Sequence, residues 1–214
     1  MTGAERRARL ARSRLYLVLE ARPYGAEPDA RLDAALQDGI DVVQLRDKEL
    51  PDGELVAAAE PVRHACETHG ALFVLNGRPD LVAACRADGV HVGRHDTPVA
   101  EAREAVGPER LVGLSVSSRA EIEAAEGADY LGVGAVFGTP TKPDAEAGGL
   151  ELVRAAAELV RTPWFAIGGV EPDTVAEVVA AGAPGVAVVR AIRDADDPEA
   201  AARALRAAVT PHAG

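Results

Sequence analysis

Three polar residues with alternate spacing carry the first chemical signal in this sequence. Gln44, Arg46 and Lys48 lie in one short segment, and every second side chain of an extended segment points to the same side. Two cations and an amide buried together without an anion would destabilise a fold. Because arginine binds phosphate oxygens in pairs and lysine acts as a point charge, the pattern predicts a clamp for a polyanion. An ion-pair layer with Asp47 or Asp96 is the structural alternative.

Lysine is scarce in this chain, which has two lysines, Lys48 and Lys142, against 21 arginines. An ammonium group supplies a compact point charge that a guanidinium cannot. Both lysines follow predicted strand ends on one face, so we interpret them as functional, with chance survival in an arginine-rich sequence as the alternative.

A long loop at residues 135–149 carries a second group of candidates. Thr139, Thr141 and Lys142 offer two hydroxyls and an ammonium there. Loops of this length inside a compact domain are usually lids or binding loops. We expect this one to bind a second phosphate or to close over the first, and a solvated turn is the alternative.

Two glycines and an arginine near the C-terminus suit a phosphate. Gly168 and Gly169 precede a helix expected at 172–181, whose first turn carries Pro172, and they leave backbone N–H groups available at a helix N-terminus. With Arg190 after the last strand, they occupy the usual phosphate-binding position of a barrel.

A magnesium ligand is expected at Asp96, the only carboxylate in its loop, because Mg²⁺ that bridges phosphates takes one or two carboxylates plus water. Capping of the following helix is the alternative role. We expect His91 to be a strand-end polar contact, His95 to be exposed, and Ser115 to hydrogen-bond a ligand. Two phosphate sites without an acid/base pair favour a dissociative step, in which diphosphate leaves and positive charge develops on carbon.

Eight β-then-α units position these residues. Strands are expected at 15–19, 42–46, 71–76, 89–92, 111–115, 130–134, 164–167 and 185–189, and helices at 29–38, 51–68, 79–87, 98–106, 119–125, 150–160, 172–181 and 198–208. This α/β pattern predicts a single-domain (β/α)8 TIM barrel at 15–214, with its active site at the C-terminal strand ends. A doubly wound open sheet is the alternative. Residues 1–14 are expected to be an extension or a helix on the barrel floor.

The composition narrows the classes of partner. The chain has 214 residues, 48% hydrophobic, and a net charge of −11, which argues against nucleic acid or an anionic membrane as a partner. No apolar run is long enough for a membrane span, and Cys66 and Cys85 fit no disulfide or metal pattern. We expect a reduced, cytoplasmic protein that binds small phosphorylated molecules, and a homo-oligomer is compatible with the sequence.

These segments resemble the thiamine phosphate synthase family from about residue 15 to residue 192. The motifs that carry the resemblance are VVQLRDK (42–48), the turn at Asn76, ADGVHVGRHD (87–96), GLSVSS (113–118), ADYLGVGAVFGTPTKPDA (128–145), WFAIGGV (164–170) and GVAVVRAI (185–192). The resemblance implies a transferase that joins 4-amino-2-methyl-5-(diphosphooxymethyl)pyrimidine to 4-methyl-5-(2-phosphooxyethyl)thiazole, giving thiamine phosphate and diphosphate. In this family diphosphate leaves with the help of Mg²⁺, and the thiazole nitrogen captures the pyrimidine cation.

The resemblance also implies roles for individual residues. The pyrimidine diphosphate would be held by Gln44, Leu45, Arg46, Asp47, Lys48, Asn76, Ser115 and Lys142. The thiazole phosphate would be held by Thr139, Pro140, Thr141, Gly169, Val189 and Arg190, and Mg²⁺ by Asp96. Of these, Gln44, Arg46, Lys48, Ser115 and Lys142 are the expected catalytic residues.

Three positions depart from the family pattern. Gly77 replaces an Asp that is the second Mg²⁺ ligand, Ser117 replaces a frequent His, and Arg190 replaces a frequent Ser. Related thiazole tautomerases also carry Gly at the turn, but their catalytic His would align with Ser117. A tautomerase-like isomerase and a non-catalytic barrel that binds a thiazole phosphate are therefore the alternative functions.

Overall fold

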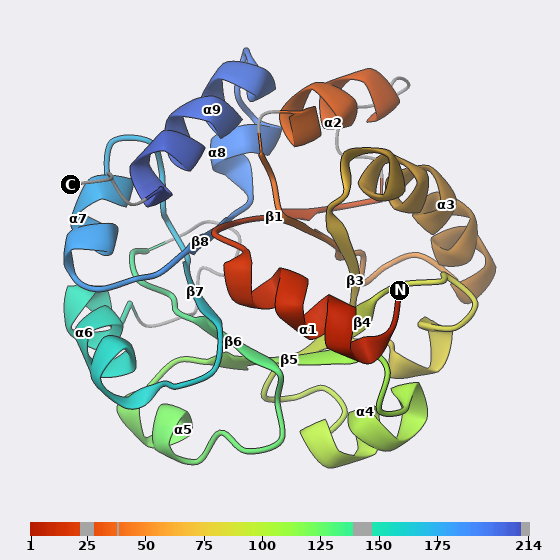
Figure 1. The fold of residues 1–214 in the computed structure, drawn as a ribbon, viewed down its shortest axis with the longest axis horizontal. Helices are drawn as coiled ribbons and strands as arrows, with labels where there is room; N and C mark the ends of the chain where they lie inside the picture. The colour runs from red at the N-terminus through yellow and green to blue at the C-terminus, as the bar shows by residue number, and fades with distance from the viewer. Residues whose placement is uncertain (22–27, 38, 139–146, 211–214) are drawn as a thin grey trace.

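Eight parallel strands form a closed barrel in which each strand pairs with the next and β8 pairs with β1 (Figure 1). The structure, a computed structural model, describes residues 1–21, 28–37, 39–138 and 147–210. The strands are β1 (Leu15–Leu19), β2 (Val42–Leu45), β3 (Leu72–Asn76), β4 (Gly89–Val92), β5 (Leu111–Val116), β6 (Tyr130–Val133), β7 (Trp164–Ile167) and β8 (Val186–Val188). Closure confirms the (β/α)8 barrel and excludes the open doubly wound sheet.

Helices surround the barrel and alternate with the strands (Figure 1). They are α2 (Pro28–Gln37), α3 (Asp52–His69), α4 (Val99–Val106), α5 (Arg119–Glu123), α6 (Gly149–Leu159), α7 (Val175–Ala180) and α9 (Pro198–Val209). The helix α3 ends at a glycine, which is a common sequence signal for a helix C-terminus. Gly70 is its C-cap and has a left-handed conformation, with a φ of 74°.

The helix expected at residues 79–87 is wrong, because only the short 3₁₀ turn η1 (Pro79–Leu81) forms there. Pro79, Val82 and Cys85 are buried at every third position. That spacing matches three residues per turn better than the 3.6 of an α-helix.

Two further differences lie near the C-terminal strands. The helix expected from residue 172 begins instead at Val175, since Glu171 N donates to Thr174 Oγ1 at 3.0 Å within a turn that precedes it. Pro172 therefore precedes α7 and is not in its first turn. The short helix α8 (Arg190–Arg193), which directly follows β8, is not expected from the sequence.

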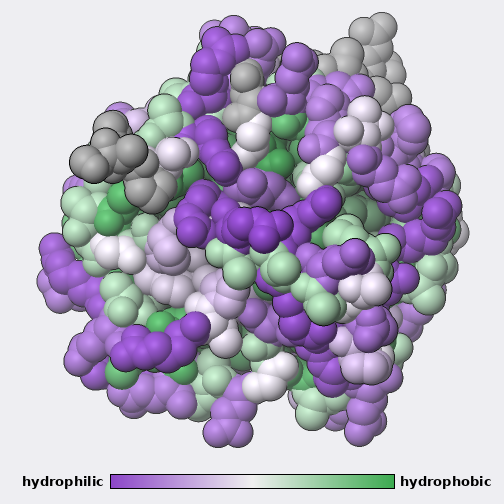
Figure 2. Space-filling model, in the orientation of Figure 1, coloured by the Kyte–Doolittle hydropathy of each residue, from purple (hydrophilic) through white to green (hydrophobic). Residues whose placement is uncertain are grey.

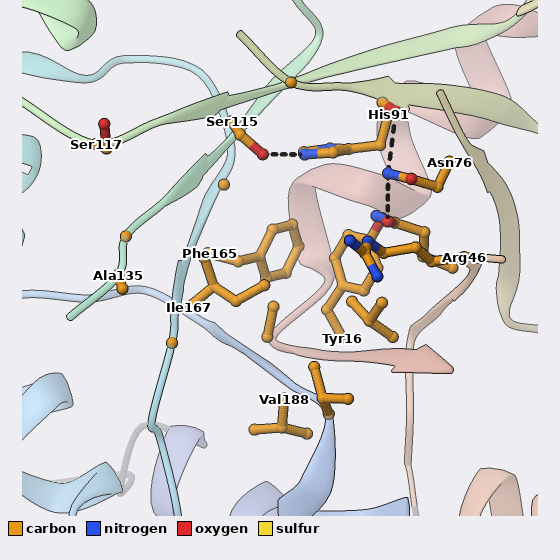
Figure 3. Close-up of a pocket in the computed structure, with 18 of the residues that line it drawn as sticks. Tyr16, Arg46, Asn76, His91, Ser115, Ser117, Ala135, Phe165, Ile167 and Val188 are labelled. Carbon is orange, nitrogen blue, oxygen red and sulfur yellow. Dashed lines mark hydrogen bonds between the residues drawn. The ribbon is translucent and has the colours of Figure 1, made fainter. Parts of the chain in front are cut away.

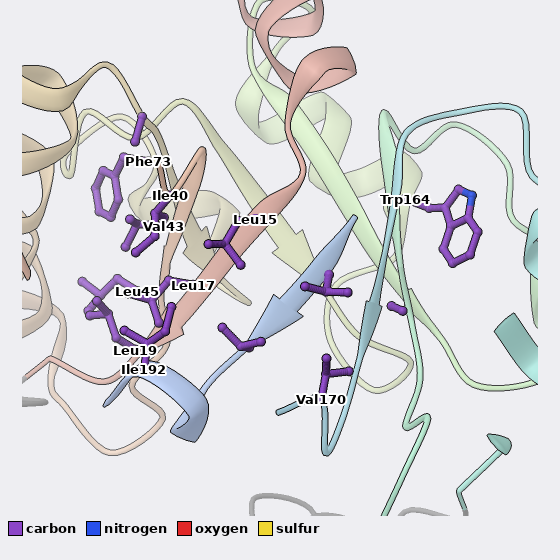
Figure 4. Packing of buried hydrophobic residues seen from close by; sticks show 14 of the residues in the cluster. Leu15, Leu17, Leu19, Ile40, Val43, Leu45, Phe73, Trp164, Val170 and Ile192 are labelled. Atoms are coloured by element: carbon purple, nitrogen blue, oxygen red, sulfur yellow. The ribbon is translucent and has the colours of Figure 1, made fainter. Parts of the chain in front are cut away.

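Side chains of every strand except β4 alternate between two apolar clusters. Leu15, Leu17 and Leu19 pack outward with the helices, together with Val43 and Leu45 (Figure 4). The intervening residues pack inside the barrel, where the cluster contains Tyr16, Val18, Val42, Leu72, Val74, Leu111, Tyr130, Phe165 and Ala187. The period of two in each strand thus separates the outer core from the barrel interior.

The helix α1 (Gly3–Arg12) lies across the N-terminal end of the barrel (Figure 1). Leu10 is buried in the interior cluster, and the outer surface of this end is a mainly hydrophilic band (Figure 2). Arg6 is also buried and pairs with Asp88, with 2.8 Å between Nε and Oδ1. Since α1 covers this end, the opposite end carries the candidate site. No described helix is long and apolar enough to cross a membrane.

Three aspartates at this covered end tie strands to arginines. Asp41, Asp88 and Asp129 each come directly before a strand and accept a backbone N–H from the strand beside it. Their ion-pair partners are Arg206 for Asp41, Arg6 for Asp88, and both Arg7 and Arg103 for Asp129. Charge at the N-terminal end of the barrel is thus neutralised locally.

Candidate active site at the C-terminal strand ends

One cavity of about 1010 Å³ opens at the C-terminal ends of the strands. Every strand contributes a residue to its lining: Tyr16, Gln44, Asn76, His91, Ser115, Tyr130, Phe165 and Ala187. Loops that follow the strands contribute charged side chains around the mouth. This is the end at which barrel enzymes carry their active sites.

The segment after β2 divides as its alternation predicts. Gln44, Arg46 and Lys48 line the cavity, and Gln44 is buried whereas Lys48 is exposed. Leu45 packs in the outer core, and Asp47 Oδ1 accepts backbone N–H bonds from residues 49 and 50. Neither Leu45 nor Asp47 is among the described residues that line the cavity, so their roles in substrate binding stay predictions.

Arg46 and Lys48 have no acidic partner among the residues that the structure describes. Among the described residues, no ion pair or hydrogen bond joins either side chain to a carboxylate, so the alternative of an ion-pair layer with Asp47 or Asp96 is wrong there. The other two arginines that line the cavity, Arg94 and Arg190, are each paired with a glutamate. Among the described arginines and lysines of the cavity, the two without a carboxylate partner therefore lie beside β2.

Asp96 lines the cavity beside the turn that follows β3. Its Oδ2 accepts a hydrogen bond from Gly93 N at 2.8 Å. It does not cap α4, whose N-cap is Pro98 with no side-chain hydrogen bond. A Cβ at Gly77 would lie 3.6 Å from Asp96 Oδ2, so the two positions adjoin.

The part of the chain that the structure describes has no group of three or more His, Cys, Asp or Glu side chains placed to hold a metal ion. A single carboxylate still fits Mg²⁺, which usually binds through one or two carboxylates plus waters and substrate phosphates. Asp96 therefore suits a metal ion that arrives with a diphosphate better than one held by the protein alone.

Opposite charges face each other where β7 and β8 end. Arg190 Nη2 lies 3.9 Å from Glu171 Oε1, and both side chains line the cavity with Gly169. Burial raises the pKa of the Glu171 carboxyl, nearby Asp173 adds to this, and Arg190 partly opposes it. Gly169 has a φ of 66°, and a Cβ there would lie 2.7 Å from Phe137 Cβ, so glycine lets the two loops approach closely.

A cluster at the mouth of the cavity involves Ser117, the residue that stands where the family often has His. Arg94 Nη2 donates to Ser117 Oγ at 2.7 Å and also pairs with Glu121. Glu121 accepts from both the backbone N and the hydroxyl of Ser117. Although burial raises the pKa of Glu121, these hydrogen bonds outweigh it and the pKa is lowered overall. Ser117 is thus hydrogen-bonded to a carboxylate and a guanidinium. Neither group supplies the imidazole that a His at this position would bring.

A continuous chain of hydrogen bonds crosses the cavity floor and was not expected from the sequence; its contact between Ser115 and His91 is drawn in Figure 3. His91 Nε2 lies 2.8 Å from Ser115 Oγ, and His91 Nδ1 lies 3.2 Å from Tyr130 OH. The chain goes on to Tyr16 OH at 2.9 Å from Tyr130 OH, and to Gln44 Nε2 at 2.7 Å from Tyr16 OH. Burial raises the pKa of both tyrosines, so both phenols are neutral.

A signal for this chain was present in the sequence. Tyr16 and Tyr130 occupy inward positions of predicted strands, and a buried tyrosine hydroxyl usually requires a hydrogen-bond partner. His91 and Gln44 are buried polar residues of two other strands and also line the cavity. His91 is confirmed as a strand-end polar contact, but its position beside Ser115 was missed.

Four expected site residues, Thr139, Pro140, Thr141 and Lys142, lie outside the described residues. Gly138, just before them, lines the cavity. The expectation that both lysines share one face is therefore supported for Lys48 alone, and the roles of Thr139, Pro140, Thr141 and Lys142 stay predictions.

Comparison with known proteins finds consistent relatives. A family model described as thiamine monophosphate synthase matches residues 15–192. A thiamine-phosphate synthase of Thermobifida fusca is 48% identical over 205 residues, which cover 94% of each chain. One of Gloeobacter violaceus is 47% identical, and the match covers 92% of this chain but 58% of that protein. A solved thiamine phosphate pyrophosphorylase from Pyrococcus furiosus superposes with a TM-score of 0.85 at 36% identity, covering 94% of this chain and 96% of that one.

Proposed function

Because the chain belongs to the thiamine monophosphate synthase family, we infer that it is a transferase that makes thiamine phosphate. It joins 4-amino-2-methyl-5-(diphosphooxymethyl)pyrimidine to 4-methyl-5-(2-phosphooxyethyl)thiazole and releases diphosphate. The bond from the pyrimidine methylene carbon to the diphosphate oxygen breaks, and a bond from that carbon to the thiazole nitrogen forms.

The observation that carries this proposal is the pair of cations in the cavity, Arg46 and Lys48, that no described carboxylate neutralises. The chain has a net charge of −11, so acidic residues outnumber basic ones, yet no described carboxylate neutralises these two side chains. Two cations left without a partner at a cavity mouth are suited to a substrate that brings its own negative charge. A diphosphate is such a substrate.

We assign the leaving group to the β2 side of the cavity. Arg46, Lys48 and Lys142 bind the diphosphate and stabilise the charge that grows on it as the carbon–oxygen bond breaks. Asn76 and Ser115 orient the pyrimidine, and Gln44 supports them from the cavity floor. No protein nucleophile is required, because the thiazole nitrogen attacks the carbon directly.

Asp96 is the residue that would hold Mg²⁺, together with the diphosphate and water. When bound, the ion would neutralise negative charge on the diphosphate and so make the diphosphate a better leaving group. Gly77 offers no second carboxylate, so the diphosphate itself contributes more of the ion's ligands than in relatives with Asp there.

We assign the thiazole phosphate to the other side of the cavity. The backbone at Gly169 and Val189 and the guanidinium of Arg190 are suited to its oxygens, with Thr139, Pro140 and Thr141 closing from the loop after β6. For this, the Arg190 guanidinium must leave the Glu171 carboxylate and bind the phosphate instead.

The test is a coupling assay with both phosphorylated substrates and Mg²⁺, with thiamine phosphate and diphosphate measured. We expect turnover by the wild type, a loss of at least about 100-fold in kcat/KM for Arg46→Ala, and little change for Arg154→Ala. Arg154 is an exposed arginine paired with Glu151, is not among the residues that line the cavity, and serves as the matched control. Isomerisation of the thiazole alone would favour a tautomerase, and tight binding without turnover would favour a non-catalytic barrel.

A further inference from the structure

The chain of hydrogen bonds on the cavity floor has a direction that the donors and acceptors fix. Six side chains from six different strands take part: Asn76, Gln44, Tyr16, Tyr130, His91 and Ser115. A hydroxyl or an imidazole nitrogen can donate or accept, but a backbone carbonyl can only accept. One such carbonyl sets the direction of the whole chain.

The fixed end is the carbonyl of His91. Asn76 Nδ2 lies 3.5 Å from His91 O and 3.1 Å from Gln44 Oε1, so the NH₂ group of Asn76 donates to both oxygens. Gln44 therefore presents its own NH₂ group on the other side, where Nε2 donates to Tyr16 OH at 2.7 Å. A flip of Gln44 alone would set two NH₂ groups against each other.

The two phenols transmit the direction. Tyr16 OH accepts from Gln44, so its proton points to Tyr130 OH, 2.9 Å away. Tyr130 OH then accepts from Tyr16, and its proton points to His91 Nδ1 at 3.2 Å. Both phenols are buried, and burial raises the pKa of each, so each keeps its proton.

The opposite direction leaves a proton without an acceptor. If His91 Nδ1 carried a proton, it would donate to Tyr130, and Tyr130 would donate to Tyr16. Tyr16 OH would then receive two donors, Tyr130 and Gln44, and its own proton would face no acceptor among the described residues. A doubly protonated His91 meets the same obstacle. Buried hydroxyl groups left in this state are strongly disfavoured.

We propose that the chain holds His91 as a neutral imidazole protonated on Nε2, which donates to Ser115 Oγ and directs the Ser115 hydroxyl proton into the cavity. Ser115 is then a hydrogen-bond donor to the substrate, and His91 is a positioning residue that acts through it. Resting on the proposed function, the group that Ser115 faces is an acceptor of the pyrimidine diphosphate, either a ring nitrogen or a diphosphate oxygen.

The direction has a consequence for selectivity. A site built to donate one hydrogen bond rejects a ligand that presents a donor at the same place, because two donors then face each other. The residues that enforce this, Tyr16 and Tyr130, lie on the buried floor of the cavity.

The tautomer of His91 is directly measurable. ¹⁵N-labelled histidine in the intact enzyme gives separate NMR signals for protonated and unprotonated ring nitrogens, and His91→Gln identifies the signals of His91 among the five histidines. We expect an unprotonated Nδ1 and a protonated Nε2 at neutral pH. A protonated Nδ1 in the wild type would overturn the proposal, whether or not the enzyme couples its substrates.

Two tyrosine variants form a matched pair. Tyr130→Phe removes the donor to Nδ1, so we expect a mixture of His91 tautomers and a kcat lower by about tenfold, the effect of one hydrogen bond. Tyr16→Phe makes the same change one step further away and leaves His91 Nδ1 as the acceptor for Tyr130, so the tautomer should be retained. An unchanged tautomer in Tyr130→Phe would contradict the proposed direction.

Ser115 variants separate the donor role from packing. Ser115→Ala should lower kcat about tenfold or more, and Ser115→Thr, which keeps a hydroxyl, should recover most of it. Equal rates for the alanine and threonine variants would show that the hydroxyl does not donate to the substrate. If the wild type does not couple the two substrates at all, the proposed function fails, and the tautomer measurement still decides the direction of the chain.

Discussion

Restoring a carboxylate at position 77 tests the magnesium site most directly. A Cβ at Gly77 would lie 3.6 Å from Asp96 Oδ2 and 3.8 Å from Oδ1, so Gly77→Asp places a second carboxylate beside the first. The φ of Gly77 is 67°, in the left-handed region. Asp and Asn tolerate this region better than other side chains, so the substitution should fold.

The magnitude follows from Coulomb's law. A carboxylate and a divalent ion about 4 Å apart in water attract by about 2 kcal/mol, and the repulsion of about 1 kcal/mol between the two carboxylates is present with and without the ion. The gain of about 2 kcal/mol in Mg²⁺ binding lowers the Mg²⁺ concentration for half-maximal rate by up to about 30-fold. Without Mg²⁺ the same repulsion should lower the melting temperature of Gly77→Asp, and Mg²⁺ with diphosphate should raise it again.

The assay is the coupling rate at saturating substrates as a function of free Mg²⁺, with calorimetric titration of Mg²⁺ and diphosphate as a second readout. Gly77→Asn is the matched control, because it shares the backbone tolerance and size of Asp without the charge. If Gly77→Asp and Gly77→Asn require the same Mg²⁺ concentration as the wild type, neither position 77 nor Asp96 belongs to the metal site.

Three shorter predictions concern charge elsewhere. Glu171→Gln should lower KM for the thiazole phosphate about threefold, the effect of a partly exposed ion pair, because it frees Arg190. Burial raises the pKa of Glu171, so its competition weakens as pH falls through that raised pKa, and the KM values of variant and wild type should converge there. Lys142→Arg should lower kcat by about tenfold or more, and wild-type kinetics would make this lysine an accident of composition. Arg6→Ala leaves the partly buried carboxylate of Asp88 without its cation, so urea unfolding should show a loss of about 2 kcal/mol with kcat unchanged.

The barrel itself could be predicted from the sequence because each unit repeats one strong local pattern. The strands β1, β4 and β7 begin and end where apolar runs and their flanking residues place them. The errors fall where local signals are weak. The segment 79–87 has too few buried residues on one face for an α-helix. The helix α8 has only four residues. Neither segment is therefore marked by the 3.6-residue period of an α-helix.

The site was predictable only where its chemistry lies within one segment. Gln44, Arg46 and Lys48 share a side because of their alternation, which is a local property. The chain on the floor is different, because Tyr16 and Tyr130 are 114 residues apart and meet only when the barrel closes. The neighbours of His91 in the sequence do not indicate its role, because its partner Ser115 lies on the next strand, 24 residues away.

The two ends of the barrel differ in how their described charged side chains are paired, and this difference is the physical basis of the proposed function. At the covered end, Asp41, Asp88 and Asp129 each meet an arginine, and the ion pairs serve stability. At the open end, Arg46 and Lys48 have no such partner among the described residues, although acids outnumber bases in the chain, 34 to 23. Because no described carboxylate competes for these two cations, an anionic substrate that binds them should stabilise the folded enzyme. Thermal stability should therefore rise with diphosphate through these two residues, and it should not do so in the double variant that lacks both cations.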